Sequence, residues 1–307
     1  DALAGLQYTY QAEGKPKQAL AEIDTFLATR PAGIAEEELF LRKGDIFFDQ
    51  GDFAGASQEY RRLLNLKPTP VVQARAWHQL GRAYELQNDL SHASEAYHKV
   101  VSDFPDAENG PAARLALGMV QIKAKQFRAA ATTLEGFDAR YPDAQLLTEV
   151  HFQLGMAYMN ISADEVAFRQ FQSVIKSAPD NIFADRSRLE MARMFTFRKE
   201  YKASLDTLDA LLNRRNDDLA AEALIMIGEN HADAKKYREA LQAFHDVIEQ
   251  YKDFPLQMER ARLRLGETYE KMKDRKQARL AYQEILKSPV DPAVQKDVQQ
   301  RLKRMKR

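Results

Sequence analysis

The sequence predicts an all-α solenoid of about eight helical hairpins, followed by one C-terminal capping helix. Three observations predict it. Glycine recurs at a nearly constant spacing, a small and then a large residue follow each glycine at fixed distances, and proline recurs where a second helix should end. Self-similarity at a period of about 20 to 50 residues is the signature of stacked repeats. Strand-like alternation is absent over any useful length, so no β pattern competes.

The glycine spacing sets the period. Successive positions are 37 residues apart up to residue 192, and the last two intervals are 36 and 38 residues. The positions are Gly44, Gly81, Gly118, Gly155, Ala192, Gly228 and Gly266. Glycine inside a helix costs about 1 kcal/mol relative to alanine. Its recurrence at one phase therefore indicates that a second helix crosses closely at this point.

The residues of the second helix keep the same register. A small residue stands twelve positions after each glycine: Ala56, Ala93, Ala130, Ala167, Ser204, Ala240 and Ala278. A large residue follows four positions later: Tyr60, Tyr97, Leu134, Phe171, Leu208, Phe244 and Tyr282. We interpret the small residue as a close contact between the two helices of a hairpin and the large residue as the side chain that fills the space beside the glycine.

Helix ends agree with this register. Four prolines lie 24 residues after a repeat glycine, where the missing amide donor and the ring would end the second helix: Pro68, Pro105, Pro142 and Pro179. Asp106, Asp143 and Asp180 follow three of them, and we expect each to cap, or to charge favourably, the start of the next helix. The run from Glu36 to Glu38 should favour the start of a helix in the same way. Asn216 replaces the proline of the sixth repeat, which predicts a less rigid turn.

The register divides the chain into a solenoid, residues 1–290, and a capping helix, residues 291–307. The repeats are approximately 1–36, 37–73, 74–110, 111–147, 148–184, 185–220, 221–258 and 259–290. Gln7 takes the glycine position of the first repeat, so the chain should start inside a helix, as a piece cut from a longer protein would. In the capping helix, Asp291 can cap, Pro292 suits the first turn, and one apolar stripe follows: Val294, Val298, Leu302 and Met305.

Composition narrows the function. Lys plus Arg and Asp plus Glu both total 45, so the electrostatic drive that nucleic-acid binding needs is missing. The absence of cysteine excludes disulfides and thiolate sites, and it suits an oxidising compartment without proving one. No apolar run is long enough to span a membrane. No histidine spacing fits a zinc motif, and no phosphate loop or nucleophile elbow occurs, so we predict a protein that is not an enzyme and has no cofactor or metal.

Several of these residues resemble the tetratricopeptide repeat. The third repeat carries the pattern most fully, as Trp77, Leu80, Gly81, Tyr84, Ala93, Tyr97 and Pro105. The resemblance implies a right-handed superhelix whose concave face binds other proteins. The period of 37 and the junctions at 103–107 and 140–144 resemble a bacterial envelope variant, which includes the outer-membrane assembly lipoprotein and the Tol-Pal coordinator. That narrower resemblance implies a periplasmic location, with a cytoplasmic one as the alternative.

The resemblance also implies which positions of each first helix line the concave face. In the middle repeats they are largely apolar and rich in methionine, which suits an amphipathic helix or an extended segment. We predict that the partner-binding groove consists of Met119, Ile122, Phe152, Met156, Met159, Asn160, Arg193 and Phe197. The alternative is that several of them pack between adjacent first helices, Phe152 above all. Charged residues at equivalent positions should pair with one another, as Glu38–Arg75, Asp45–Arg82, Arg186–Glu222 and Arg193–Glu229.

The sequence therefore favours a non-catalytic scaffold that binds a protein or peptide segment in cell-envelope assembly, secretion or polysaccharide export. The main alternative is the regulatory or substrate-docking arm of a larger enzyme or cytosolic complex. A clamp for C-terminal carboxylates is disfavoured, because the concave positions lack the Lys and Asn that such clamps use. RNA-binding repeats are disfavoured by the zero net charge. Direct membrane insertion is not expected, although a segment before residue 1 could tether the chain, and no feature predicts an oligomeric state.

Overall fold

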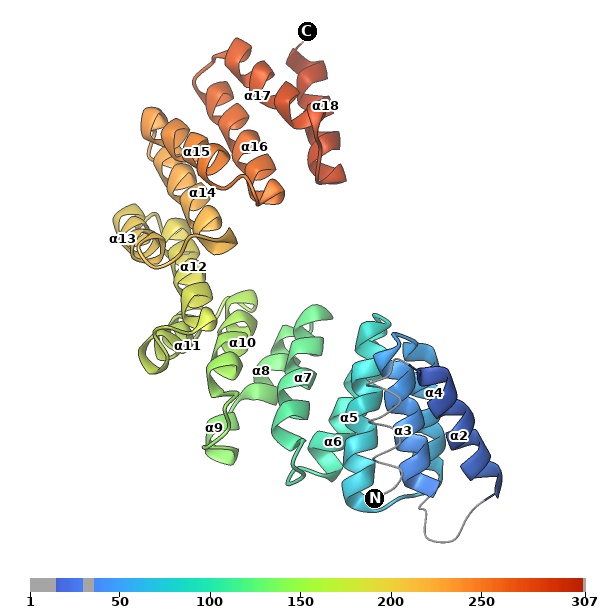
Figure 1. Ribbon diagram of the computed structural model, residues 1–307. Helices are drawn as coiled ribbons and strands as arrows, with labels where there is room; N and C mark the ends of the chain where they lie inside the picture. Colours follow the sequence, from blue (N-terminus) through green and yellow to red (C-terminus); the bar gives the residue numbers. More distant parts are fainter. Residues whose placement is uncertain (1–14, 30–35, 306–307) are drawn as a thin grey trace. The chain divides into compact units, whose positions relative to one another are not determined.

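A computed structural model describes residues 15–29 and 36–305, and the regular structure within these residues is entirely α-helical (Figure 1). The all-α solenoid predicted from the sequence is confirmed. In the first repeat, α2 (Pro16–Thr29) is the second helix. The expected first helix around Gln7 and the turn at Pro31 lie outside the described residues.

Seven further hairpins follow in order along the described chain. They are α3 (Glu36–Asp49) with α4 (Phe53–Asn65), α5 (Pro70–Leu86) with α6 (Leu90–Asp103), α7 (Gly110–Lys123) with α8 (Phe127–Leu134) and α9 (Phe137–Arg140), α10 (Leu147–Asn160) with α11 (Asp164–Ser177), α12 (Ile182–Phe197) with α13 (Tyr201–Leu212), α14 (Asp218–Asp233) with α15 (Tyr237–Gln250), and α16 (Pro255–Lys271) with α17 (Arg275–Lys287). The capping helix is α18 (Pro292–Met305).

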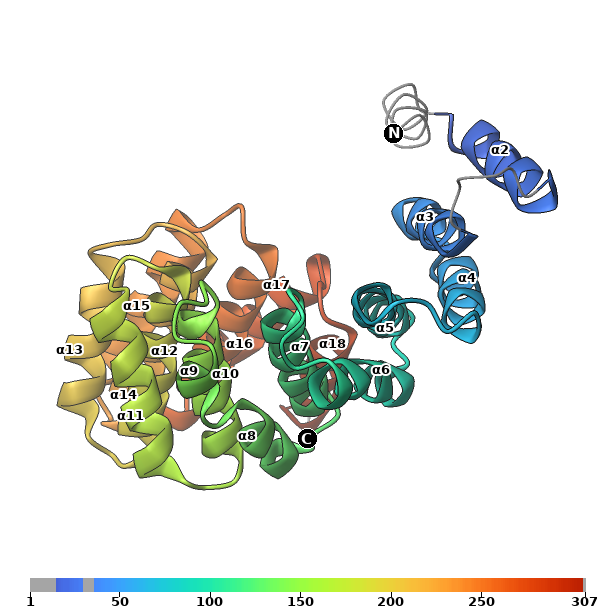
Figure 2. The same cartoon turned by 90° about the horizontal axis from the view of Figure 1, so that it is seen from below.

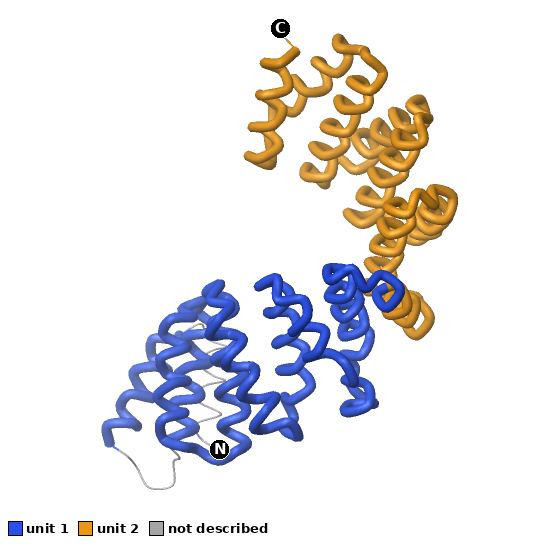
Figure 3. Tube along the Cα trace, turned by 180° about the vertical axis from the view of Figure 1, so that it is seen from behind, with its two compact units in different colours: residues 1–167 blue, residues 168–307 orange. Residues whose placement is uncertain are grey.

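The chain divides into two compact units, residues 1–167 and 168–307, with the boundary inside α11 (Figure 3). Within each unit, a helix packs against the helices before and after it in sequence. Figure 2, which looks along many of the helix axes, shows this for α3, α4, α5 and α6 of the first unit. The core is correspondingly a series of apolar clusters, each shared by neighbouring hairpins.

The predicted crossing at the repeat glycines is confirmed. A Cβ atom added to Gly44 would lie 2.4 Å from the ring of Tyr60, and one added to Gly228 would lie 2.4 Å from the ring of Phe244. Gly81 with Tyr97, Gly118 with Leu134 and Gly266 with Tyr282 repeat the arrangement. Tyr60 and Phe244 are fully buried. Glycine is therefore required because the second helix brings a large side chain against the backbone of the first.

The turn inside each hairpin has one recurring backbone conformation. The residue seven positions after the repeat glycine has a positive φ, between 58° and 77°, in all seven hairpins: Gly51, Asn88, Lys125, Ser162, Lys199, Lys235 and Lys273. In the seventh repeat, the amide of Lys235 donates to the carbonyl of Ala232 (3.1 Å) and that of Lys236 to the carbonyl of His231 (2.8 Å). This pair of bonds is the Schellman motif, which ends a helix with a left-handed residue.

The aspartates that follow the prolines are not the N-caps of the next helices, which corrects the capping part of the sequence prediction and leaves the charge part a prediction. The N-cap positions of α7 and α12 belong to Asn109 and Asn181, because the turn continues beyond the aspartate before the helix begins. Asp180 instead pairs with Arg214 of the next repeat at 2.6 Å. Asp106 pairs with Arg140 in the same way. Asp143 lies before Leu146, the N-cap of α10. Asp106 and Asp180 therefore link the turns of successive repeats.

The turn after the sixth repeat lacks proline but is held by ion pairs. Arg215 bonds both Asp217 and the buried Asp185, and Asp185 also accepts from Arg188 at 2.6 Å. Charged side chains thus stand where repeats two to five have a proline.

The acidic run at residues 36–38 and the capping helix follow the prediction. The acidic residues 36–38 occupy the first turn of α3. Asp291 accepts from the amide of Ala293 at 2.7 Å and so caps α18, whose Val298 is buried against α17.

Candidate partner-binding surface

In each unit the first helices of successive hairpins lie side by side. In the first unit they are α3, α5, α7 and α10, and in the second unit α12, α14 and α16, with each helix contacting the next of its unit. We call these surfaces the first-helix faces. The sequence predicts that partner-binding residues lie on them.

Six of the predicted groove residues belong to α7 and α10 of the first unit, which are in contact. Met119 and Ile122 are partly buried and pack against the cluster that contains Leu154. Met156 and Met159 of α10 are also partly exposed. We call Met119, Ile122, Met156 and Met159 the methionine patch. Two of its side chains, Met119 and Ile122, pack against an apolar cluster, and all four side chains are partly exposed.

The other two residues on these helices differ from the methionine patch. Phe152 is 8% exposed, so its ring contributes mainly to packing. Asn160 is exposed at the end of α10, where its amide donates to the carbonyl of Met156 at 2.9 Å. Their assignment to a partner-binding groove stays a prediction, as does that of the methionine patch.

Arg193 and Phe197 belong to the second unit, on α12. The ring of Phe197 is 84% exposed although it is large and apolar. Arg193 forms ion pairs with Glu222 of α14 at 2.8 Å and with Glu190 of its own helix at 3.4 Å. Burial raises the pKa of Glu190 above its ordinary value, although Arg193 opposes this. The exposed ring is thus available to a partner, whereas the guanidinium is already engaged.

Charged residues on the first-helix faces do pair across neighbouring helices, but with other partners than predicted. Asp45 pairs with Arg75 (3.4 Å) rather than Arg82, and it also accepts from Gln79 (3.2 Å). Arg82 instead lies over the ring of Phe48, 4.7 Å from its centroid. Asp45 therefore faces residues one to two turns before its equivalent on the next helix, whereas Glu85 reaches Lys123, one position beyond its own equivalent.

In the second unit, one predicted partner is again replaced by a residue two turns earlier, whereas Glu222–Arg260 and Asp233–Lys271 join equivalent positions. Arg193 pairs with Glu222 rather than Glu229, and Glu222, 8% exposed, also binds Arg260 of α16. Arg186 does not bind Glu222 as predicted, because its guanidinium lies over the ring of Phe183 on its own helix. In the first unit, Glu38 likewise pairs with Arg42 of the same helix at 2.6 Å instead of Arg75.

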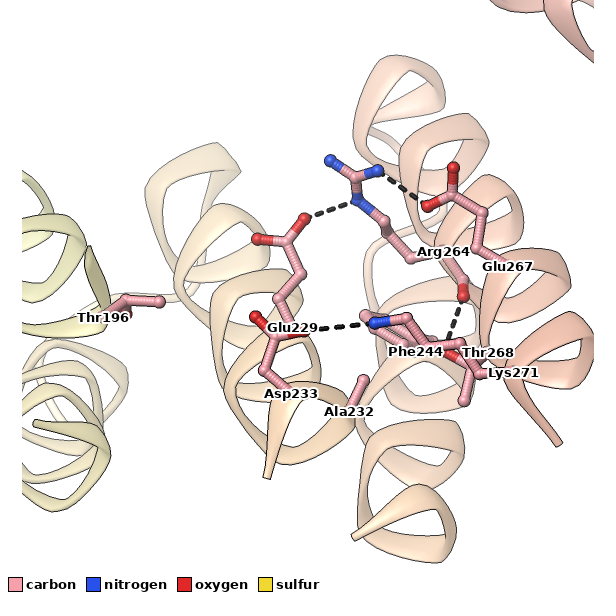
Figure 4. A pocket seen from close by; sticks show the side chains of 9 residues that line it. All are labelled: Thr196, Glu229, Ala232, Asp233, Phe244, Arg264, Glu267, Thr268 and Lys271. Atoms are coloured by element: carbon pink, nitrogen blue, oxygen red, sulfur yellow. Dashed lines mark hydrogen bonds and ion pairs between the residues drawn. The ribbon is translucent and has the colours of Figure 1, made fainter. Parts of the chain in front are cut away.

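A cavity of about 270 Å³ lies on the first-helix face of the second unit, between α14 and α16 and beside Thr196 of α12 (Figure 4). Two ion pairs cross from α14 to α16 at this cavity. Glu229 Oε1 accepts from Arg264 Nε at 2.5 Å, and Asp233 pairs with Lys271 at 3.1 Å. This cavity was not predicted from the sequence, although the small Ala232 is a signal for it, since larger residues occupy the equivalent position of the other repeats.

Two titratable side chains of the first unit, Tyr60 and His78, have pKa values shifted by burial. Burial, aided by Asp45, raises the pKa of Tyr60 above its ordinary value, so the hydroxyl stays protonated and donates to Asp45 at 2.7 Å. Burial, reinforced by Arg82, lowers the pKa of His78 to about 4, and its ring packs against Tyr97 with centroids 5.6 Å apart.

Residues 15–29 and 36–305 were also considered for metal binding and membrane insertion through the side chains and helices that they contain. Side chains of His, Cys, Asp and Glu form no group of three or more that could hold a metal ion in this part of the chain. No helix in the same part is both long enough and apolar enough to cross a membrane.

The stacked hairpins and the first-helix faces define a helical-repeat protein of the solenoid class. Family models described as tetratricopeptide repeats match residues 8–71 and 41–108, 112–144, and 231–302, which together make up more than half of the chain. The chain belongs to the tetratricopeptide repeat family. A search of curated proteins finds no match.

Solved structures share the fold at low sequence identity. A tetratricopeptide repeat protein from Parabacteroides merdae is 14% identical with a TM-score of 0.65, covering 88% of this chain and 99% of its own. The C-terminal part of a repeat protein from Cytophaga hutchinsonii is 15% identical with a TM-score of 0.60, covering 83% and 97%. A chain of the APC/C hetero-tetramer Cut9–Hcn1 is 16% identical with a TM-score of 0.55, covering 94% and 52%.

Proposed function

We propose that this protein is a non-catalytic scaffold that holds a segment of a protein partner on its first-helix faces. The observation that carries the proposal is the methionine patch on α7 and α10, whose side chains are partly exposed above a packed apolar cluster. Flexible, polarizable methionine side chains can adapt to a partner's apolar surface. The exposed ring of Phe197 on α12 offers a second apolar contact.

The partner segment that suits this surface is an amphipathic helix or an extended peptide with spaced apolar side chains. One structural neighbour is a chain of the APC/C hetero-tetramer Cut9–Hcn1, which supports assembly with other chains as a use of this fold. The regulatory or docking arm of a larger enzyme or cytosolic complex is the second candidate, because such an arm would use the same surface.

For the setting, we propose the bacterial periplasm, in envelope assembly, secretion or polysaccharide export. The absence of cysteine supports a periplasmic setting, because the chain then has no thiol that an oxidising compartment could damage. The repeat period of 37 residues and the junctions at 103–107 and 140–144 support it by resemblance. Detection of the native protein in the periplasmic fraction of its source organism tests this part, and recovery in the cytosolic fraction contradicts it.

The binding proposal is tested by replacing Met156 and Met159 together with glutamate. Peptides of random sequence are first selected by display on the wild-type protein, and their affinities are then compared. We expect the double variant to lose these peptides while its circular dichroism stays unchanged. Met272→Glu is the matched control, since this methionine is 43% exposed in the second unit and lies outside the methionine patch. Loss of helicity in the double variant, or unchanged peptide affinity, contradicts the proposal.

A further inference from the structure

The cavity between α14 and α16 exists because one position of the repeat is small. Ala232 stands four residues after the repeat glycine, where three other repeats have Phe48, Ile122 and Met159. Beside it, the ring of Phe244 is 1% exposed and lines the cavity. A partner side chain that enters here finds apolar surface that is already packed from behind.

The rim of the cavity has an excess of negative charge. Arg264 pairs with Glu229 and also with Glu267, since Glu267 Oε2 lies 2.8 Å from Arg264 Nη1 (Figure 4). Arg301 adds no free cation, because it already contacts three carboxylates, those of Glu267, Glu270 and Asp297. With the Lys271–Asp233 pair, this network contains five carboxylates and three cations.

Two carboxylate oxygens on α14 remain open to a ligand. Glu229 and Asp233 are four residues apart and therefore share one side of the helix. Hydrogen bonds from the described residues reach Oε1 of Glu229 and Oδ1 of Asp233. Oε2 of Glu229 and Oδ2 of Asp233 receive none from this part of the chain. The two side chains are 31% and 49% exposed, so a partner can approach both.

We propose that this cavity is a socket for one arginine side chain of the partner segment, an inference that rests on the proposed scaffold function. The aliphatic stem lies against Ala232 and Phe244, and the planar guanidinium donates to the open oxygens of Glu229 and Asp233, a geometry that suits arginine. An acidic side chain would meet the excess negative charge. An aliphatic one would bury carboxylates without a partner, which is costly.

The test uses Nα-acetyl-L-arginine amide as the probe and methyl NMR of the full chain as the readout. We expect the methyl signals of Ala232 and Thr268 to shift on titration, and Nα-acetyl-L-leucine amide to leave them unchanged. Ala232→Leu fills the cavity and should abolish the shifts of Thr268. Glu229→Gln with Asp233→Asn should weaken binding about tenfold or more, as loss of a hydrogen bond to a charged group does. Glu85→Gln, which neutralises a paired carboxylate on the first unit, is the matched control and should bind normally.

Each outcome decides the inference. Equal shifts with the leucine probe, no shift with the arginine probe, or unchanged arginine binding in both variants overturns it. Ala232 is 6% exposed, so thermal unfolding of Ala232→Leu is compared with the wild type; if this variant unfolds, the double variant Glu229→Gln with Asp233→Asn decides. Peptide selection separates the two proposals. Peptides that bind through the methionine patch without arginine enrichment refute the socket alone, whereas the absence of any selected peptide refutes the scaffold.

Discussion

The first-helix faces of the two units differ in chemistry although the same repeat builds both. In the first unit, the residues four positions after the repeat glycine are mostly large and apolar: Phe48, Glu85, Ile122 and Met159. In the second unit they are Thr196, Ala232 and Glu270, and ion pairs connect α12, α14, α16 and α18. The contact between the two helices of a hairpin changes little between units. The repeat therefore separates the residues that fold the chain from those that select a partner, and each class can be tested by itself.

The largest expected effect compares two phenylalanines of the second unit. Phe244 is 1% exposed and packs beside Gly228, whereas Phe197 is 84% exposed. Phe244→Ala should lower the free energy of unfolding by about 3 to 5 kcal/mol, because it leaves a cavity in the core. Phe197→Ala should change it by less than about 0.5 kcal/mol, as exposed substitutions usually do. Urea unfolding followed by circular dichroism measures both.

The phenylalanine comparison has a second readout in partner binding. Phe197→Ala should weaken binding of display-selected peptides although it leaves the fold intact. Comparable destabilisation by the two substitutions would show that the ring of Phe197 belongs to the fold, and the division between framework and recognition residues would fail in the second unit.

The second effect is a pH dependence specific to the first unit. The pKa of His78 is about 4 in the folded chain, against about 6.5 in an unfolded one. Because the folded value is lower, His78 contributes its full stability above about pH 6.5 and loses it as the pH falls toward 4. The loss should reach about 3 kcal/mol. The fluorescence of Trp77, the one tryptophan of the chain, follows urea unfolding next to this residue.

The control for His78 is His78→Gln, measured across the same pH range. The carboxylates of the protein titrate in both chains, so only the difference between wild type and variant reports on the histidine. The free energy of unfolding of the variant, relative to that of the wild type, should rise as the pH falls from 7 to 4. A difference that stays constant with pH would mean that the imidazole titrates alike in the folded and unfolded chains.

The sequence was sufficient to predict contacts inside a hairpin. Gly44 and Tyr60 lie sixteen residues apart on two helices joined by a short turn, so their periodic recurrence reports one local geometry. Partners across hairpins were predicted less well, as Asp45 with Arg75 shows. Which residue a side chain reaches on the next hairpin depends on how all side chains at the interface pack, and no single spacing encodes it. The capping helix was predictable because Asp291 and its apolar stripe are local signals.

Two other features had weaker signals in the sequence. The left-handed turn residues were missed because lysine has no turn preference that would reveal them, unlike glycine or asparagine. The cavity at Ala232 becomes visible only when the same position is compared across repeats. The cavity is thus a departure of one side chain from a regular background, whereas the left-handed turn is part of that background and recurs in each of the seven described hairpins.

The smallest expected effect concerns these turns and distinguishes the units again. The first unit has Gly51 and Asn88 at two of its left-handed positions, whereas all three hairpins of the second unit have lysine there, at φ of 61° to 65°. Lys235→Gly removes the clash of Cβ with the backbone, which costs about 1 to 2 kcal/mol, but it increases the entropy of the unfolded chain. We expect a net gain of about 0.5 to 1 kcal/mol in the free energy of unfolding.

The matched control for the turn is Lys236→Gly, one residue later. Lys236 has φ of −86° and is the N-cap of α15, so glycine there relieves no strain and adds only unfolded-state entropy. Gly51→Lys should destabilise the first unit by roughly the amount that Lys235→Gly stabilises the second. Thermal unfolding measures the three variants side by side. If Lys235→Gly and Lys236→Gly lower stability equally, the lysine turns carry no strain, and the units differ in their first-helix faces alone.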